Sequence, residues 1–215
     1  MKIIVFGDSV ADGERDEEGG WVQRLKRSID AKRMPDSKAN NIPVYNLSVS
    51  GDNTEGLLKR FDSEIRYLLD KDTPLTILFA IGLNDSAFFM NNNANWVSRK
   101  RFAENLKSLV AMAKKYTGQI IFIGLTPVDE SKTTPIPWRE ELHYRNEYVK
   151  EYDAEIKKMC KENDILFIDI FGAFSKTNYK TLLEDGLHPN SQGHKKIFEI
   201  VKAYLIDKKI LGKGG

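Results

Sequence analysis

Cysteine and histidine are scarce in this sequence of 215 residues, which contains one cysteine and three histidines. Cys160 has no partner for an intramolecular disulfide, so the fold cannot depend on oxidation, and we interpret this residue as a structural thiol. A metal hydrolase would need a cluster of histidine and carboxylate ligands, and the three histidines show no familiar ligand spacing. We therefore expect no metal site and no cofactor.

Long hydrophobic runs and an excess of one charge are also absent. The apolar run in the N-terminal MKIIVFGDS is too short for a signal peptide core or a membrane span. The net charge is only +2, with basic and acidic residues interleaved, which argues against an extended nucleic-acid surface. We expect a cytoplasmic protein without stable membrane anchoring, although a signal peptide removed beforehand would leave the same sequence. The oligomeric state is not indicated.

The sequence does contain an alternation of short apolar runs and longer amphipathic segments. The apolar runs are typical of strands buried on both faces of a parallel sheet, at 2–6, 43–48, 75–81, 120–125 and 165–170. Helical patterns follow them, at 19–34, 54–70, 98–116, 138–163 and 191–207. This pattern predicts a single α/β domain over 1–210, with a doubly wound parallel sheet in the flavodoxin-like order 2-1-3-4-5. A flexible tail is expected at 211–215.

Small and polar residues follow the first three predicted strands, in GDSVADG (7–13), SGDNTEG (50–56) and GLNDSAFF (82–89). Ligands of such sheets bind beyond the carboxyl ends of the strands, where the strand order reverses. These loops therefore bring Ser9, Gly51 and Asn84 to one rim, and the segment EDGLH follows the fifth strand on the same rim. Asp185 and His188 of that segment can complete a set of nucleophile, base and orienting acid with Ser9.

These segments resemble the conserved blocks of the SGNH hydrolases, also called the GDSL esterase and lipase family. FGDS, the glycine after the second strand, GLND and DGLHPN occur in the family's order between residues 7 and 188. The resemblance implies a serine hydrolase with a flavodoxin-like three-layer α/β/α fold. It implies a catalytic triad of Ser9, Asp185 and His188, and an oxyanion hole formed by Ser9, Gly51 and Asn84. The first block reads GDSV where GDSL is usual, which keeps an apolar side chain after the serine.

The chemistry of acyl transfer requires these residue types independently. His188 can accept the proton of Ser9 because an imidazole titrates near neutrality, and Asp185 can orient the ring and stabilise the imidazolium. The backbone N–H groups of Ser9 and Gly51 and the side-chain amide of Asn84 can stabilise the oxyanion. The chain contains no GxSxG motif, which disfavours the α/β-hydrolase fold.

Each candidate also has a structural interpretation. Ser9 could cap a helix, Gly51 could serve a turn, Asn84 could form one with Asp85, and His188 could be a plain loop histidine. We assign structural roles to the remaining residues: loop bracing for Asp8 and Asp85, a surface or capping position for His194, a helix face for His143 and the core for Trp21.

The substrate is the least defined part of the prediction. Phe88, Phe89, Met90 and Trp96, in the segment 86–98, either line an acyl or aryl pocket or pack under their loop. No long uncharged helix suggests an interfacial lid, so small soluble esters are favoured: short-chain acyl or acetyl esters, including acetylated sugars, hydrolysed through an acyl-enzyme. Thioesters and lysophospholipids are alternative substrates, and a non-catalytic flavodoxin-like binding module is the alternative function.

Overall fold

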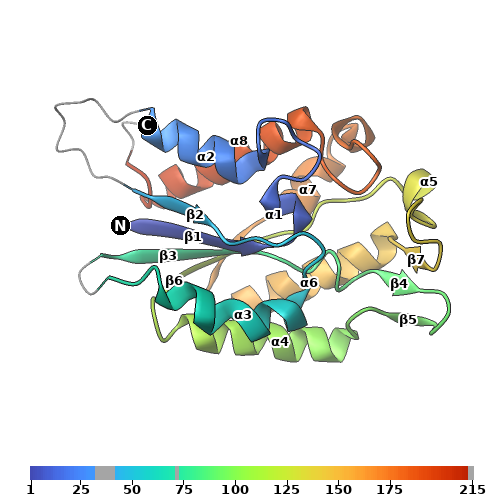
Figure 1. Ribbon diagram of the computed structural model, residues 1–215, viewed down its shortest axis with the longest axis horizontal. Coiled ribbons are helices and arrows are strands. Elements are labelled where there is room, and N and C mark those ends of the chain that lie inside the picture. Colours follow the sequence, from blue (N-terminus) through green and yellow to red (C-terminus); the bar gives the residue numbers. More distant parts are fainter. Residues whose placement is uncertain (32–41, 71–72, 213–215) are drawn as a thin grey trace.

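The computed structural model describes residues 1–31, 42–70 and 73–212, and its centre is a parallel sheet of five strands (Figure 1). In chain order these strands are β1 (Lys2–Gly7), β2 (Val44–Asn46), β3 (Leu75–Ala80), β6 (Gln119–Ile123) and β8 (Leu166–Ile168). Their spatial order is β2-β1-β3-β6-β8, which confirms the predicted order 2-1-3-4-5. β1 therefore lies between β2 and β3, where the strand order reverses.

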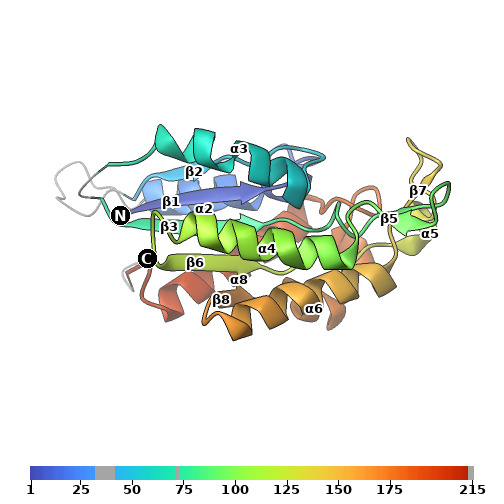
Figure 2. The ribbon, with the colours of Figure 1, turned by 90° about the horizontal axis from the view of Figure 1, so that it is seen from below.

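Helices cover both faces of the sheet and form the outer layers of a three-layer α/β/α fold, as predicted (Figure 1). One face carries α1 (Ser9–Asp12), α2 (Gly20–Asp30), α7 (Ile170–Ser175) and α8 (Ser191–Asp207). The other carries α3 (Thr54–Arg66), α4 (Arg99–Ala113) and α6 (Asn146–Glu162), which lie side by side in Figure 2. Within the part of the chain that the structure describes, no helix combines the length and apolar character needed to cross a membrane.

The two faces of β1 show why the strands read as continuous apolar runs. Successive side chains of a strand point to opposite faces, so Ile3 and Val5 pack under α2 and α8 while Ile4 and Phe6 pack under α3 and α4. On the α3 side Phe6 joins Phe61, Phe79 and Phe122, with neighbouring ring centroids 4.8 to 6.0 Å apart. Aromatic burial on this scale dominates core energetics.

A second, small antiparallel sheet lies beyond the carboxyl ends of the main strands and was not predicted (Figures 1 and 2). It consists of β4 (Phe88–Phe89), β5 (Ala94–Asn95) and β7 (Leu142–His143), in the order β5-β4-β7. The helix predicted at 138–163 begins only at Asn146, because residues 142–143 pair with β4 instead. The prediction that His143 lies on a helix face is therefore wrong. Pairing between residues so distant in sequence depends on tertiary context, which a local helical pattern does not contain.

Other elements agree with the sequence or are shorter than predicted. Asn190 caps α8 by accepting hydrogen bonds from Gln192 N and Gly193 N, and Trp21 is buried at the start of α2, as expected. Two further short helices, α5 (Glu130–Thr133) and the 3₁₀ helix η1 (Tyr179–Leu182), complete the described elements. Leu211, just after the expected domain limit, is buried in the core on the α2 and α8 side. Residues 213–215 of the expected tail, and 32–34 of the first predicted helix, lie outside the described residues.

Cys160 is buried in α6, and burial raises the pKa of its thiol to about 12. The reactive thiolate form is therefore disfavoured near neutral pH, which agrees with a structural thiol.

The aromatic cluster provides a test of the core. Phe79→Ala should lower the free energy of unfolding by about 3 to 5 kcal/mol, because it removes a buried ring and leaves a cavity. Urea or guanidinium denaturation followed by circular dichroism measures this loss. Tyr67, which is 91% exposed, is the control: Tyr67→Ala should change stability by less than about 0.5 kcal/mol. Equal losses in both variants would contradict this account of the core.

Candidate active site

The structure brings together the three residues that the sequence predicts as a triad. Ser9 follows β1 directly at the start of α1, while Asp185 and His188 lie between η1 and α8. Ser9 Oγ is 3.0 Å from His188 Nε2, across 179 positions of the sequence, and His188 Nδ1 is 2.8 Å from Asp185 Oδ2. Both distances are within hydrogen-bonding range. Ser9 and His188 are almost completely buried, at 6% and 4% exposure. This arrangement can transfer a proton from the serine hydroxyl to the imidazole.

The close spacing of Asp185 and His188 has a local structural reason. Asp185 Oδ1 accepts hydrogen bonds from Leu187 N at 3.0 Å and from His188 N at 2.8 Å, so the aspartate closes its own turn. Gly186 occupies this turn with φ +91°, and a Cβ there would lie 2.7 Å from Lys132 Cβ. Burial raises the pKa of Asp185, but the hydrogen bonds and charge of His188 outweigh it and hold this pKa below its ordinary value. Asp185 is therefore ionised at neutral pH.

Gly51 and Asn84 line the same cavity as Ser9 and His188, with a volume of about 360 Å³. Gly51 has φ +78°, a conformation that other residues rarely adopt. The Asn84 amide nitrogen donates to Asp52 O at 2.7 Å, and its carbonyl oxygen accepts from the Tyr144 hydroxyl at 2.7 Å. An amide nitrogen carries two hydrogens, so one remains for a ligand. Tyr144 thus sets the orientation of the amide. Sequence reasoning missed this residue because its segment was assigned to a helix.

Asp8 and Asp85 brace the loops beside the site, as the sequence predicts. Asp8 Oδ1 accepts from Val10 N at 3.1 Å. The two Asp85 oxygens accept from Thr54 N at 3.2 and 3.1 Å and from the Thr54 hydroxyl, to which Asn105 donates in turn at 2.9 Å. Burial raises the pKa of both aspartates to about 7, against the opposing effect of these hydrogen bonds. Through its hydrogen bonds to Thr54, Asp85 joins the loop after β3 to the loop that carries Gly51.

The predicted substrate-binding residues are only partly at the cavity. Trp96 lines it, whereas Phe88, Phe89 and Met90 do not. Phe88 stacks on Tyr148 of α6, Phe89 packs edge-on against Trp96, and Met90 is half exposed. The rest of the apolar lining comes from Ile136, Trp138, Leu142 and Leu187.

One known protein family matches most of this chain. The model of the GDSL-like lipase/acylhydrolase family matches residues 5–196. The chain belongs to this family. It is accordingly a hydrolase of ester bonds, with esterase or acylhydrolase activity on small ester substrates.

Curated and structural relatives of this GDSL-like hydrolase cover nearly its whole length. The human isoamyl acetate-hydrolyzing esterase 1 homolog is 26% identical over 97% of this chain and 82% of its own. A lipase/acylhydrolase from Enterococcus faecalis superposes with a TM-score of 0.74 at 23% identity, covering 96% of each chain. Axe2, an acetylxylan esterase from Geobacillus stearothermophilus, has a TM-score of 0.68 at 22% identity and covers 94% of this chain and 92% of its own. The two structural matches show the shared fold.

His194 of the GDSL-like hydrolase corrects a prediction, since it is fully buried in α8 rather than at the surface or in a cap. Its Nε2 lies 3.3 Å from Glu14 O, and its Nδ1 is buried without a hydrogen-bond partner among the described residues. Burial lowers the pKa of His194 to about 4, so the ring is neutral in the folded hydrolase near pH 7. The helical periodicity of the sequence could not predict that His194 is buried, because its burial depends on the loop around Glu14 packing over α8.

The buried histidine should make the hydrolase sensitive to acid. The folded pKa lies below the unfolded value of 6.5, so between pH 6.5 and 4 the unfolded chain binds the proton and stability falls as the pH falls. Relative to His194→Gln, the wild type should lose about 2 to 3 kcal/mol of unfolding free energy between pH 7 and pH 4. Urea denaturation of both proteins at both pH values measures this difference. The contributions of the buried carboxyl groups to the pH dependence are the same in the two proteins and therefore cancel. An identical pH dependence of the two proteins would contradict a buried neutral His194.

Proposed function

We propose that the protein is a serine esterase that hydrolyses small carboxylic esters with short acyl groups, such as acetyl esters, through an acyl-enzyme. The observation that carries this proposal is the hydrogen-bonded chain from Ser9 through His188 to Asp185. A serine hydroxyl needs an adjacent base to become a nucleophile, and a base needs an orienting acid to hold its reactive nitrogen toward the serine. Both requirements are met at one cavity.

The proposed reaction uses Ser9, His188 and Asp185 in two stages, formation of the acyl-enzyme and its hydrolysis. Ser9 Oγ attacks the ester carbonyl while its proton passes to His188 Nε2, and Asp185 stabilises the resulting imidazolium. The tetrahedral intermediate collapses as Nε2 returns the proton to the departing alcohol oxygen. A water molecule then attacks the acyl-enzyme, gives its proton to Nε2, and Ser9 recovers a proton when the carboxylic acid leaves. The donors proposed for the oxyanion are the backbone N–H groups of Ser9 and Gly51 and the amide of Asn84.

The choice of a short acyl group has two supports. The cavity volume, about 360 Å³, is near the lower end for small-molecule sites. The names of two relatives, an isoamyl acetate-hydrolyzing esterase homolog and an acetylxylan esterase, share an acetyl group but differ in the alcohol. An acetyl ester with a variable alcohol is therefore the substrate class that we propose.

The nucleophile can be tested directly. A fluorophosphonate should label Ser9 alone, as mapped by peptide mass spectrometry, because only this hydroxyl lies next to a base of the proposed triad. Ser9→Ala should lower kcat for p-nitrophenyl acetate by at least about 10³-fold. A series of p-nitrophenyl esters from acetate to palmitate measures the acyl preference. Label on another serine, or near-normal turnover by folded Ser9→Ala, would refute the proposed mechanism.

The oxyanion hole is tested at its side-chain donor. Asn84→Ala should lower kcat about 10² to 10³-fold with little change in KM, because the hydrogen bond strengthens only in the transition state. If Asn84 served only its turn, the variant would show a lower melting temperature and a near-normal kcat once folded.

Tyr144 should act through Asn84 as a positioning residue. Tyr144→Phe removes the hydroxyl that orients the amide, so kcat should fall less than in Asn84→Ala. The double variant should be no slower than Asn84→Ala alone, since the effect passes through one group. Tyr152→Phe is the matched control, because the Tyr152 hydroxyl donates to Val97 O and not to Asn84. Additive losses in the double variant would show that Tyr144 acts by another route.

A further inference from the structure

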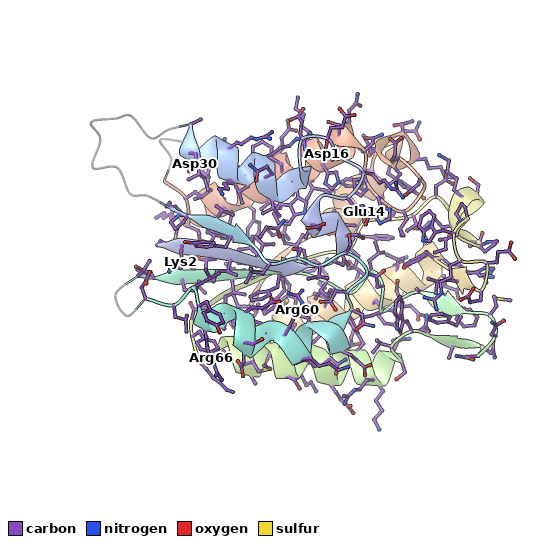
Figure 3. The ribbon with its side chains drawn as sticks, in the orientation of Figure 1. Lys2, Glu14, Asp16, Asp30, Arg60 and Arg66 are labelled. Atoms are coloured by element: carbon purple, nitrogen blue, oxygen red, sulfur yellow. The ribbon has the colours of Figure 1, made fainter. Side chains whose placement is uncertain are left out.

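Glu14 occupies a distinctive place in the cavity. Of the described residues that line this cavity, it is the only carboxylate. It lies just after α1, toward the carboxyl end of the central sheet (Figure 3). Its Oε2 is 3.9 Å from His188 Nε2, the nitrogen that also contacts Ser9. The Glu14 side chain remains 35% exposed, so a ligand in the cavity can reach it.

Neighbouring groups hold the Glu14 carboxylate in this position. Ser50 Oγ donates to Oε2 at 2.6 Å, and Arg15 Nε lies 3.8 Å from Oε1. The same Arg15 nitrogen is 3.4 Å from Asp185 Oδ2. The backbone of Glu14 is anchored as well, since its carbonyl oxygen lies 3.3 Å from His194 Nε2. A carboxylate offers about four acceptor positions, so these contacts leave some of them open to a ligand.

The proposed mechanism places the alcohol part of the ester next to Glu14. The proton that His188 Nε2 takes from Ser9 must return to the departing oxygen, so that oxygen lies within hydrogen-bonding reach of Nε2. Substituents on the neighbouring carbon atoms then lie close to Oε2. An ionised carboxylate only accepts hydrogen bonds, and the complementary substituent is therefore a donor such as a hydroxyl group.

Trp138 supplies a second surface on the same side. Its ring is stacked on His188 with centroids 6.2 Å apart and an interplanar angle of 22°, and the side chain is 52% exposed. An exposed aromatic face provides apolar contact for a carbon skeleton, while a nearby carboxylate accepts its hydroxyl protons. The combination matches an alcohol that carries several hydroxyl groups.

We propose that Glu14 is a specificity residue for the alcohol part of the ester. It accepts a hydrogen bond from a hydroxyl on the carbon next to the one that bears the ester oxygen. The protein then prefers monoesters of diols, polyols and sugars over esters of simple alcohols. This inference rests on the proposed function, since it takes His188 Nε2 as the acid that protonates the departing alcohol.

Two acetates that differ only at this hydroxyl provide the test: 2-hydroxyethyl acetate and 2-methoxyethyl acetate. Both carry the same acyl group and the same two-carbon chain, but the methoxy oxygen cannot donate. Release of acetic acid is followed by pH-stat, and each kcat/KM is divided by the rate of base hydrolysis of that ester. The wild type should prefer 2-hydroxyethyl acetate by about tenfold, the size expected for a hydrogen bond to a charged acceptor.

Variants assign this preference to one side chain. Glu14→Ala should bring the ratio of the two kcat/KM values close to one. Glu14→Gln keeps a neutral acceptor of similar size, so its ratio should fall between those of the wild type and Glu14→Ala. Glu17 is exposed on the same loop and does not line the cavity, so Glu17→Ala changes the charge equally and should keep the wild-type ratio.

The ratio of the two kcat/KM values also distinguishes a failure of this inference from a failure of the proposed function. A wild-type ratio near one would overturn the inference. So would a wild-type ratio that survives in Glu14→Ala while both rates drop, since Glu14 would then only join loops or act on His188. If Glu14→Ala fails to fold, an unchanged ratio in Glu14→Gln would overturn it. The proposed function fails differently, by hydrolysis of neither acetate or by hydrolysis that persists in Ser9→Ala.

Discussion

The hydrogen bond between Ser9 Oγ and His188 Nε2 joins the first loop of the chain to the segment before its last helix. This bond is 3.0 Å long, so the loop after β1 and the segment after β8 must be held in fixed positions relative to each other. The two strands that precede these segments, β1 and β8, are not neighbours in the sheet. The packed sheet provides this fixed relation, because strands buried on both faces cannot slide without exposing apolar side chains. Placing β1 between β2 and β3 also puts the loops of Gly51 and Asn84 on either side of Ser9.

A buried polar network keeps these loops in place. Asp85 binds the start of α3 through Thr54, and Tyr144, the residue after β7, binds Asn84. Polar groups that are buried need partners, because an unsatisfied donor or acceptor is strongly destabilising. Each of these partners is therefore confined to a narrow range of positions. Donors that are already oriented need no rearrangement when charge develops on a bound ester, which is the advantage that rigidity gives to the proposed oxyanion hole.

The two walls of the cavity have different origins and different chemistry. Glu14 and Arg15 come from the loop after α1, whereas Ile136, Trp138 and Leu142 come from the small sheet and the segment leading to it. Ile136 and Leu142 are buried in the core on the α3 side, whereas Glu14, Arg15 and Trp138 are partly exposed and lie against His188 or Asp185.

Several features could be predicted from the sequence because they depend on local patterns. Continuous apolar runs identify buried parallel strands, and DGLH is a self-contained turn in which the Asp185 carboxylate binds the backbone N–H and the ring of His188. The family blocks locate Ser9, Gly51 and Asn84 as well. The sequence could not reveal β7, the role of Tyr144 or the burial of His194, since each depends on contacts between segments far apart in the chain. The sequence by itself therefore determined which groups can do the chemistry, through residue type and strand order. Only the tertiary structure decided what surrounds them, because packing between distant segments has no local pattern.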